Sequence, residues 1–172
     1  MPKAYVLISG KLGREKEIVS KLKQVENVVD AHGTLGTFDF IAKVQADTEE
    51  DINQTIVGKI RKLEDVNSTV TLMAVEGADY LSVDSNKLMG SILGGGSAQA
   101  YVVFHANREK EILVARDLNK IPEVKEVDVV LGYYDVIGRI EAPTHKELEK
   151  LVTKDIRNIR NVQSSMTLIV NV

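Results

Sequence analysis

The chain has 172 residues, of which 44% are hydrophobic and 27% charged, a composition typical of globular proteins with one or two domains. It contains no cysteine, which excludes disulfide bonds, thiolate metal sites and cysteine nucleophiles. The 22 basic and 25 acidic residues give a net charge of −3, and no basic run is present. Because phosphate binding needs clustered positive charge, we expect no direct binding of nucleic acid.

The first predicted element is a strand over residues 4–8, a short apolar run rich in β-branched and aromatic residues. This run is too short for the core of a signal peptide or for a membrane span of about 20 residues. We therefore expect a soluble, cytoplasmic protein without a membrane partner. A helix follows, whose apolar face is formed by Ile18, Leu22 and Val25.

Two further strands are predicted over residues 28–35 and 38–44, joined by a tight hairpin at Gly36. Thr48 with Asp51 three residues later indicates a capped helix start. Apolar residues then recur at helical spacing, at Ile52, Ile56, Ile60 and Leu63. The run 68–75 alternates between apolar and polar residues, as a strand with one apolar face does.

The next segment, residues 76–99, differs in character and contains Gly94, Gly95 and Gly96. We interpret it as a linker, with a short amphipathic turn at Leu88, Met89, Ile92 and Leu93. A phosphate-binding glycine loop is the weaker interpretation, because the Lys-Ser/Thr pair that should follow the glycines is absent.

The rest of the chain repeats the first part at an offset of 96 positions. The clearest matches place Ala100–Val102 on Ala4–Val6, Gly132 on Gly36, Asp135 on Asp39, and Thr167-Leu168 on Thr71-Leu72. Arg108–Ile112 matches Arg14–Ile18 at an offset of 94, which predicts that the first copy has two extra residues in the loop before this helix. The apolar face of the helix in the second copy is then predicted at Ile112, Ala115, Leu118 and Ile121. Thr144 with Glu147 forms the second capping box. The period is that of a domain duplication, so we predict a first module over 1–75 and a second over 100–172.

The order βαββαβ in each copy predicts an α+β fold of two tandem ferredoxin-like modules, each a four-stranded antiparallel sheet with two helices on one face. The first strand of each module is apolar on both faces. We therefore expect the sheets to pack sheet to sheet, as in dimeric α/β barrels, either within the chain or with a sister subunit.

Three motifs in each module resemble the effector domain of the Lrp/AsnC family, the regulator of amino acid metabolism module. They are the Gly-x-aromatic-Asp hairpin at 36–39 and 132–135, the basic residue in the following strand (Lys43, Arg139), and the closing strands from Val66 and Val162. The resemblance implies a protein that oligomerises and binds an amino acid or similar effector, without a cofactor. No helix-turn-helix precedes the first strand, so the resemblance implies an effector sensor that acts on full-length Lrp/AsnC regulators or on other proteins.

The same resemblance implies a ligand site at the hairpins and closing strands. Its candidate residues are Gly36, Thr37, Phe38, Asp39, Thr69, Thr71, Gly132, Tyr133, Tyr134, Asp135, Ser165 and Thr167. Each aspartate either holds the effector's ammonium group or fixes its own hairpin through backbone hydrogen bonds. The hydroxyl groups have a structural alternative in cross-strand contacts, and the aromatic residues have one in interface packing.

Three other classes of protein share this topology. A small enzyme or metal-binding protein of the dimeric α/β barrel type would need a base, a metal or a haem ligand. The three histidines (His32, His105 and His145) are not repeated between the copies or spaced as ligands. We therefore expect no metal site and no catalysis. Residues 38–41 do not match the aromatic signature of an RNA-recognition motif. Another amino-acid-sensing domain of this topology has a glycine-rich loop after its first strand, and Gly10 and Gly13 match only part of that loop.

Overall fold

The computed structural model describes residues 1–76 and 98–171. Its contacts divide the chain into two compact units, the first formed mainly by Met1–Glu76 and the second mainly by residues 98–130 and Tyr134–Ile169. We describe each unit by itself. The predicted linker turn at Leu88–Leu93 lies outside the described residues.

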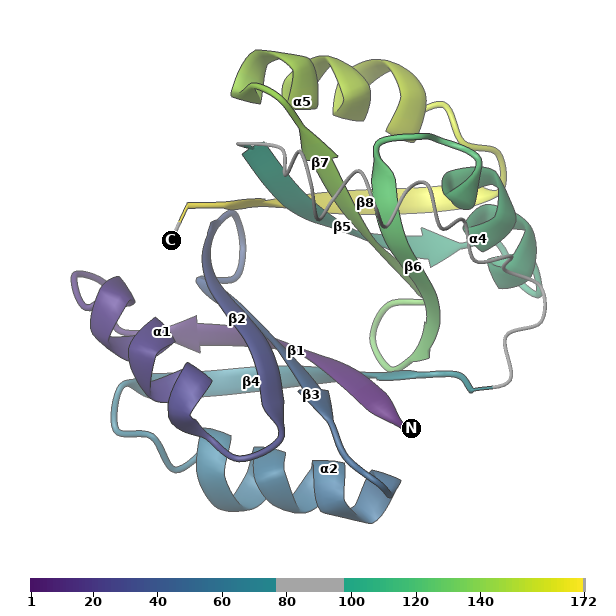
Figure 1. Cartoon of the computed structure of the whole chain (residues 1–172). Helices are drawn as coiled ribbons and strands as arrows, with labels where there is room; N and C mark the ends of the chain where they lie inside the picture. The colour runs from purple at the N-terminus through teal and green to yellow at the C-terminus, as the bar shows by residue number, and fades with distance from the viewer. Residues whose placement is uncertain (77–97, 172) are drawn as a thin grey trace. The chain divides into compact units, whose positions relative to one another are not determined.

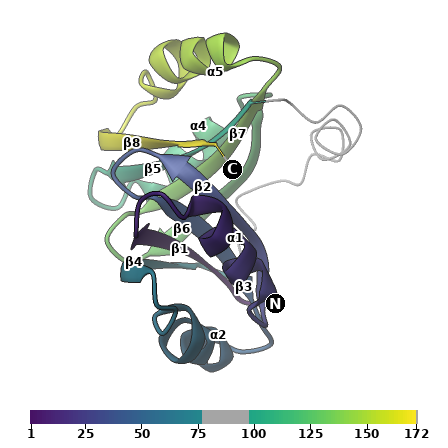
Figure 2. The same cartoon turned by 90° about the vertical axis from the view of Figure 1, so that its left-hand side faces the viewer.

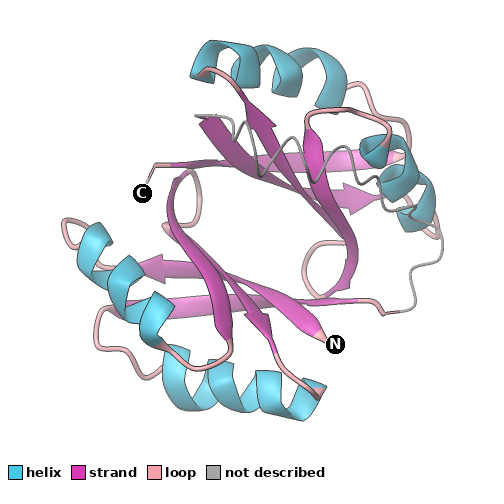
Figure 3. Ribbon diagram, viewed as in Figure 1, coloured by secondary structure: helices cyan, strands magenta, loops and turns pink. Residues whose placement is uncertain are grey.

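Unit 1 has the predicted order of strands and helices (Figure 1). Its elements are β1 (Lys3–Gly10), α1 (Glu15–Gln24), β2 (Val28–Leu35), β3 (Phe40–Gln45), α2 (Glu49–Thr55), η1 (Ile56–Ile60) and β4 (Val66–Ala74). The strands pair antiparallel in the order β4-β1-β3-β2. Both helices lie on the same face of this sheet (Figure 3).

Unit 2 repeats this arrangement. Its elements are β5 (Ala98–Ala106), α4 (Glu111–Asn119), β6 (Val124–Leu131), β7 (Val136–Ala142), α5 (His145–Leu151), η2 (Val152–Ile156) and β8 (Val162–Val170). The antiparallel order is β8-β5-β7-β6. The α+β class and the tandem ferredoxin-like repeat are therefore confirmed.

The core of unit 1 lies between its sheet and its helices. Every second residue of β1, namely Ala4, Val6 and Ile8, faces the helices and is fully buried. They pack with Phe40 and with the apolar faces of α1 and α2. The opposite face of β1 carries Tyr5 and Leu7, so both faces of this strand are apolar.

Both capping predictions are confirmed. Thr48 Oγ1 accepts a hydrogen bond from the Asp51 amide at 3.0 Å, and Thr144 Oγ1 accepts one from the Glu147 amide at 3.2 Å. Each satisfies an amide that would otherwise lack a partner in the first helical turn. Neither helix continues in the regular α form, because each passes into a π-helical turn, which the periodicity did not predict.

The predicted two-residue gap before α4 is wrong. The buried residues of α1 are Ile18, Val19 and Leu22, and those of α4 are Val114, Ala115 and Leu118, which keeps the offset at 96. Ile112 is accordingly 44% exposed and does not lie on the buried face. The short charged motif at the start of the two helices matches at an offset of 94. The residues of the two helices that pack against their sheets correspond at an offset of 96.

Candidate functional site

The two hairpins have the same backbone geometry. Gly36 has φ +148° and Gly132 has φ +149°, values that residues with a side chain rarely adopt. The amide of Thr34 donates to the Asp39 carbonyl at 2.8 Å, and the amide of Val130 donates to the Asp135 carbonyl at 2.9 Å. A glycine is therefore required at the tip of each loop, as the sequence predicted.

The hairpin aspartates bind the end of the first strand of their own module. Asp39 Oδ2 accepts a hydrogen bond from the Gly10 amide at 3.0 Å, and the Asp39 amide donates to the Ile8 carbonyl at 2.9 Å. Asp135 Oδ2 likewise accepts from the Ala106 amide at 2.8 Å. One carboxylate oxygen of each aspartate thus has a structural partner in a strand 29 residues away.

Each closing strand is separated from the hairpin of its own module by the first strand of that module. In unit 1, Thr71 pairs with Val6 and Thr69 with Ile8, so both threonines face the helices. Arg61 Nε donates to Thr69 Oγ1 at 2.8 Å. Because β1 separates β4 from β3, the threonines and Asp39 are two strand spacings apart, or about 10 Å.

Unit 2 repeats this separation. Thr167 pairs with Val102, and Ser165 pairs with Phe104 on β5. Since β5 lies between β8 and β7, these hydroxyl groups are also apart from the hairpin that carries Asp135. Within each module, the six candidate residues therefore form two groups, one in the hairpin and one in the closing strand.

The aromatic residues of the hairpins differ in their surroundings. Tyr134 is buried, its hydroxyl lies 3.7 Å from Met166 Sδ, and its ring lies 4.6 Å from that of His105. Tyr133 is 69% exposed, Phe38 is half-buried and Thr37 is exposed. Tyr134 therefore packs within the protein, whereas Tyr133 presents its ring on the surface.

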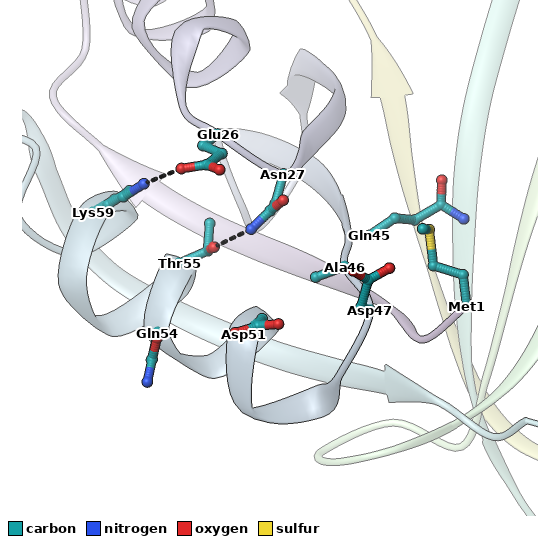
Figure 4. A pocket seen from close by; sticks show the side chains of 10 residues that line it. All are labelled: Met1, Glu26, Asn27, Gln45, Ala46, Asp47, Asp51, Gln54, Thr55 and Lys59. Atoms are coloured by element: carbon teal, nitrogen blue, oxygen red, sulfur yellow. Dashed lines mark hydrogen bonds and ion pairs between the residues drawn. The ribbon is translucent and has the colours of Figure 1, made fainter.

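A polar pocket of about 490 Å³ in unit 1 was not predicted from the sequence (Figure 4). It lies where α2 and η1 meet the start of β2 and the end of β3. Asn27 Nδ2 donates to Thr55 Oγ1 at 3.0 Å, and Lys59 Nζ pairs with Glu26 Oε2 at 2.9 Å on its wall. Asn27 lies at the edge of this pocket with a φ of +74°, which is uncommon for a residue other than glycine.

The equivalent hollow in unit 2 has a volume of about 300 Å³ and different chemistry. Pro143 replaces Asp47, and Leu151 replaces Thr55. The pocket of unit 1 has the donors and acceptors to hold a small polar molecule, and its counterpart lacks the Asp47 carboxylate and the Thr55 hydroxyl group.

Titratable groups outside the hairpins form pairs rather than metal sites. Within residues 1–76 and 98–171, no group of three His, Cys, Asp or Glu side chains is arranged to hold a metal ion. His32 Nε2 lies 3.0 Å from Asp30 Oδ2 on β2. Burial by itself raises the pKa of Asp30, but the hydrogen bond and charge of His32, the Ala31 amide and the charge of Lys23 outweigh it and lower the pKa.

We expect the Asp30 carboxyl to titrate at lower pH in the native protein than in the His32→Ala variant. A lowered pKa in the folded state adds stability above the ordinary Asp value of about 4, and this stability is lost as the pH falls through the lowered pKa. Carboxyl carbon NMR between pH 7 and pH 2 measures both midpoints. Glu17→Ala, which leaves this pair intact, is the control, and equal Asp30 midpoints in the native and His32→Ala proteins would contradict the assignment.

The part of the chain that the structure describes contains no helix that is both long and apolar enough to cross a membrane.

The folded units thus define a duplicated ferredoxin-like protein whose modules each carry a Gly-x-aromatic-Asp hairpin. The family model described as the Lrp/AsnC ligand binding domain matches residues 3–79 and again 99–171. The chain therefore belongs to the Lrp/AsnC ligand-binding domain family. The two matched segments together cover most of the sequence.

One curated relative is the HTH-type transcriptional regulator FL11 of Pyrococcus furiosus. It is 30% identical over 71 residues, which are 40% of this chain and 47% of the regulator. The match thus spans about half the length of that relative. Family membership and this relative support a regulatory, effector-binding role for the chain.

Solved structures similar to the whole chain include two enzymes. The siroheme decarboxylase NirDL has a TM-score of 0.69 at 10% identity, over 99% of this chain and 71% of that one. A mutant chlorite dismutase from Candidatus Nitrospira defluvii has a TM-score of 0.54 at 10% identity, over 99% and 91%. At such identity these similarities show the fold alone.

The expectation that the chain is not an enzyme is wrong. It rested on the lack of repeated or paired histidines, but two proteins that share the fold over nearly the whole chain are enzymes. The architecture therefore accommodates catalysis, and the placement of three histidines does not exclude it.

Proposed function

We propose that the chain is a cytoplasmic sensor of a small effector, an amino acid, and that it oligomerises and modulates protein partners of the Lrp/AsnC type. The observation that carries the proposal is the ligand-binding family model, which matches both modules. The modules proposed to act together are residues 1–75 and 100–172, joined by 76–99.

The proposed effector site uses the hairpin of each module and the hydroxyl groups of its closing strand. We propose that backbone amides around Gly36 and Gly132 meet a ligand carboxylate, since neither glycine has a side chain of its own. Asp39 and Asp135 each use Oδ2 for a backbone amide, which leaves Oδ1 for the ligand's ammonium group. Because the hydroxyl groups lie about two strand spacings from the hairpins, we propose that they belong to the far side of the site.

A thermal-shift panel of the twenty amino acids on the whole chain tests the proposal, with light scattering for the mass of the assembly. A ligand at 100 times its dissociation constant adds about 2.7 kcal/mol of stability. For a protein of this size we expect a rise in Tm of about 5–10 °C. If no amino acid raises the Tm and light scattering gives the mass of a single chain, both effector binding and oligomerisation are contradicted.

The matched variant carries Asp39→Asn and Asp135→Asn. Asparagine keeps an oxygen that can accept from the Gly10 and Ala106 amides, but it removes the charge that would hold an ammonium group. We expect this variant to fold and to lose most of the shift. If it responds like the native chain, the aspartates do not contact the effector.

A further inference from the structure

A groove in unit 2 lies between the α5–η2 helix and β8, apart from the hairpin. Its volume is about 360 Å³. Figure 2 shows α5 extending over β8, and Figure 1 shows the same arrangement from another side. The groove is lined by His145, Leu148, Glu149, Val152, Thr153, Arg157, Thr167 and Ile169.

The strand register decides which side chains of β8 face the groove. Thr167 pairs with Val102, and Val102 pairs in turn with Gly138. A Cβ added to Gly138 would lie 2.7 Å from Leu118 Cδ2 of α4, so this row of residues lies on the helix side of the sheet. Thr167 and Ile169, two residues apart on β8, therefore face the helices. From α5 and η2, Leu148 and Val152 meet them and are almost completely buried.

The rim of the groove is polar and carries a cationic side chain at the end of the π-helical turn. The Arg157 amide donates to the Val152 carbonyl at 3.1 Å and closes this turn. Such turns occur often at functional sites. Arg157 and Thr167 supply donors from opposite walls, one from the helix and one from the strand.

The duplicated module provides an internal comparison. The equivalent arginine in unit 1, Arg61, donates through Nε to Thr69 at 2.8 Å. In unit 2 the equivalent partner is Ser165, and within residues 1–76 and 98–171 no hydrogen bond or ion pair of the Arg157 guanidinium is found. Val152 also replaces the larger Ile56, and Thr153 replaces Val57, so unit 2 has a smaller apolar side chain and an added hydroxyl group at these two positions.

We propose that this groove binds a small carboxylate that carries an aliphatic chain. The planar guanidinium of Arg157 matches a carboxylate in shape and charge, and the Thr167 hydroxyl donates to the same group. The aliphatic chain lies on Ile169 and on the small exposed part of Val152, where it leaves water. A volume of 360 Å³ suits a ligand of this size, since small-molecule sites begin at about 300 Å³.

The test uses the full chain and 3-methylbutanoate as the probe, with binding followed by amide NMR. We expect the shifted resonances to come from α5, η2 and β8. Arg157→Gln should raise the dissociation constant at least tenfold. The matched variant Arg61→Gln, at the equivalent position of unit 1, should leave it within twofold.

Two further ligands define the chemistry. The uncharged 3-methylbutanamide should bind at least tenfold more weakly than the acid, because it lacks the charge that pairs with Arg157. Leucine, which adds an ammonium group, shows whether the natural ligand is an amino acid. If leucine binds more tightly than 3-methylbutanoate, the Glu149 carboxylate holds its ammonium group. If leucine binds more weakly, the groove is a site for simple acids. Equal losses in the two arginine variants, or shifts confined to other elements, would overturn the proposal.

This site and the effector site at the hairpins are independent. The Asp39→Asn and Asp135→Asn variant should bind 3-methylbutanoate normally even where its response to amino acids is lost. Arg157→Gln should keep the amino acid response at the hairpins.

Discussion

Replacing Phe40 with alanine is expected to lower the free energy of unfolding by about 3–5 kcal/mol. Phe40 is fully buried at the start of β3, where its ring packs among β1, α1 and α2. Truncation removes the aromatic surface from this core and leaves a cavity that the surrounding strands cannot fill, because their register is held by backbone hydrogen bonds.

The ring of Phe40 also explains the glycine at the end of β1. A Cβ at position 10 would lie 2.9 Å from Phe40 Cε2 and 3.0 Å from the Asp65 carbonyl oxygen. The backbone of β1 therefore approaches both groups closely, and little room exists for the strand to move when the ring is lost. This supports a value near the upper end of the range.

Urea unfolding at constant pH measures the change, with Phe38→Ala as the control. Phe38 is half-buried in the neighbouring hairpin, so its truncation should cost clearly less. A loss below about 1 kcal/mol for Phe40→Ala would mean that the core relaxes around the gap or that the ring is not packed as described.

The double variant Asp39→Ala with Asp135→Ala is expected to lose about 2–6 kcal/mol of stability, at about 1–3 kcal/mol for each site. Each change leaves a backbone amide, Gly10 or Ala106, without its acceptor in a part-buried position. The sites are in different units, so their effects should add.

The asparagine variant at the same two positions separates structure from binding. It keeps an acceptor oxygen and should lose less than half as much stability as the alanine variant in the same urea experiment. If alanine and asparagine cost equally little, the aspartates do not fix the hairpins, and the effector role alone would account for them.

Local patterns were sufficient for the strands, the helix starts and the hairpin tips. Gly36 and Gly132 adopt positive φ, and Thr48 and Thr144 cap their helices, because each of these features depends on a few neighbouring residues. On α4 the predicted residues Ala115 and Leu118 are buried, but Ile112 is exposed and Val114 takes its place, since the charged motif before the helix matched at the wrong offset.

The candidate site required more than local patterns. The sequence could identify Asp39 as a turn residue or a ligand residue, but its partner, the Gly10 amide, comes from a strand 29 residues earlier. It could not show that β1 lies between Thr69 and Thr71 and the hairpin of their own module. The groove with Arg157 carried no motif, because its lining comes from α5, η2 and β8, which meet only after folding.

The duplication, the βαββαβ order and the family resemblance follow from repetition, hydrophobic periodicity and turn residues, which can be recognised along the chain. Folding was needed to show which oxygen of each aspartate accepts a hydrogen bond and which hydroxyl groups face the helices. It also decided where a groove remains open. These properties depend on strand register and on contacts between residues distant in sequence, and a shift of one residue in register would turn each of those side chains to the other face of its sheet.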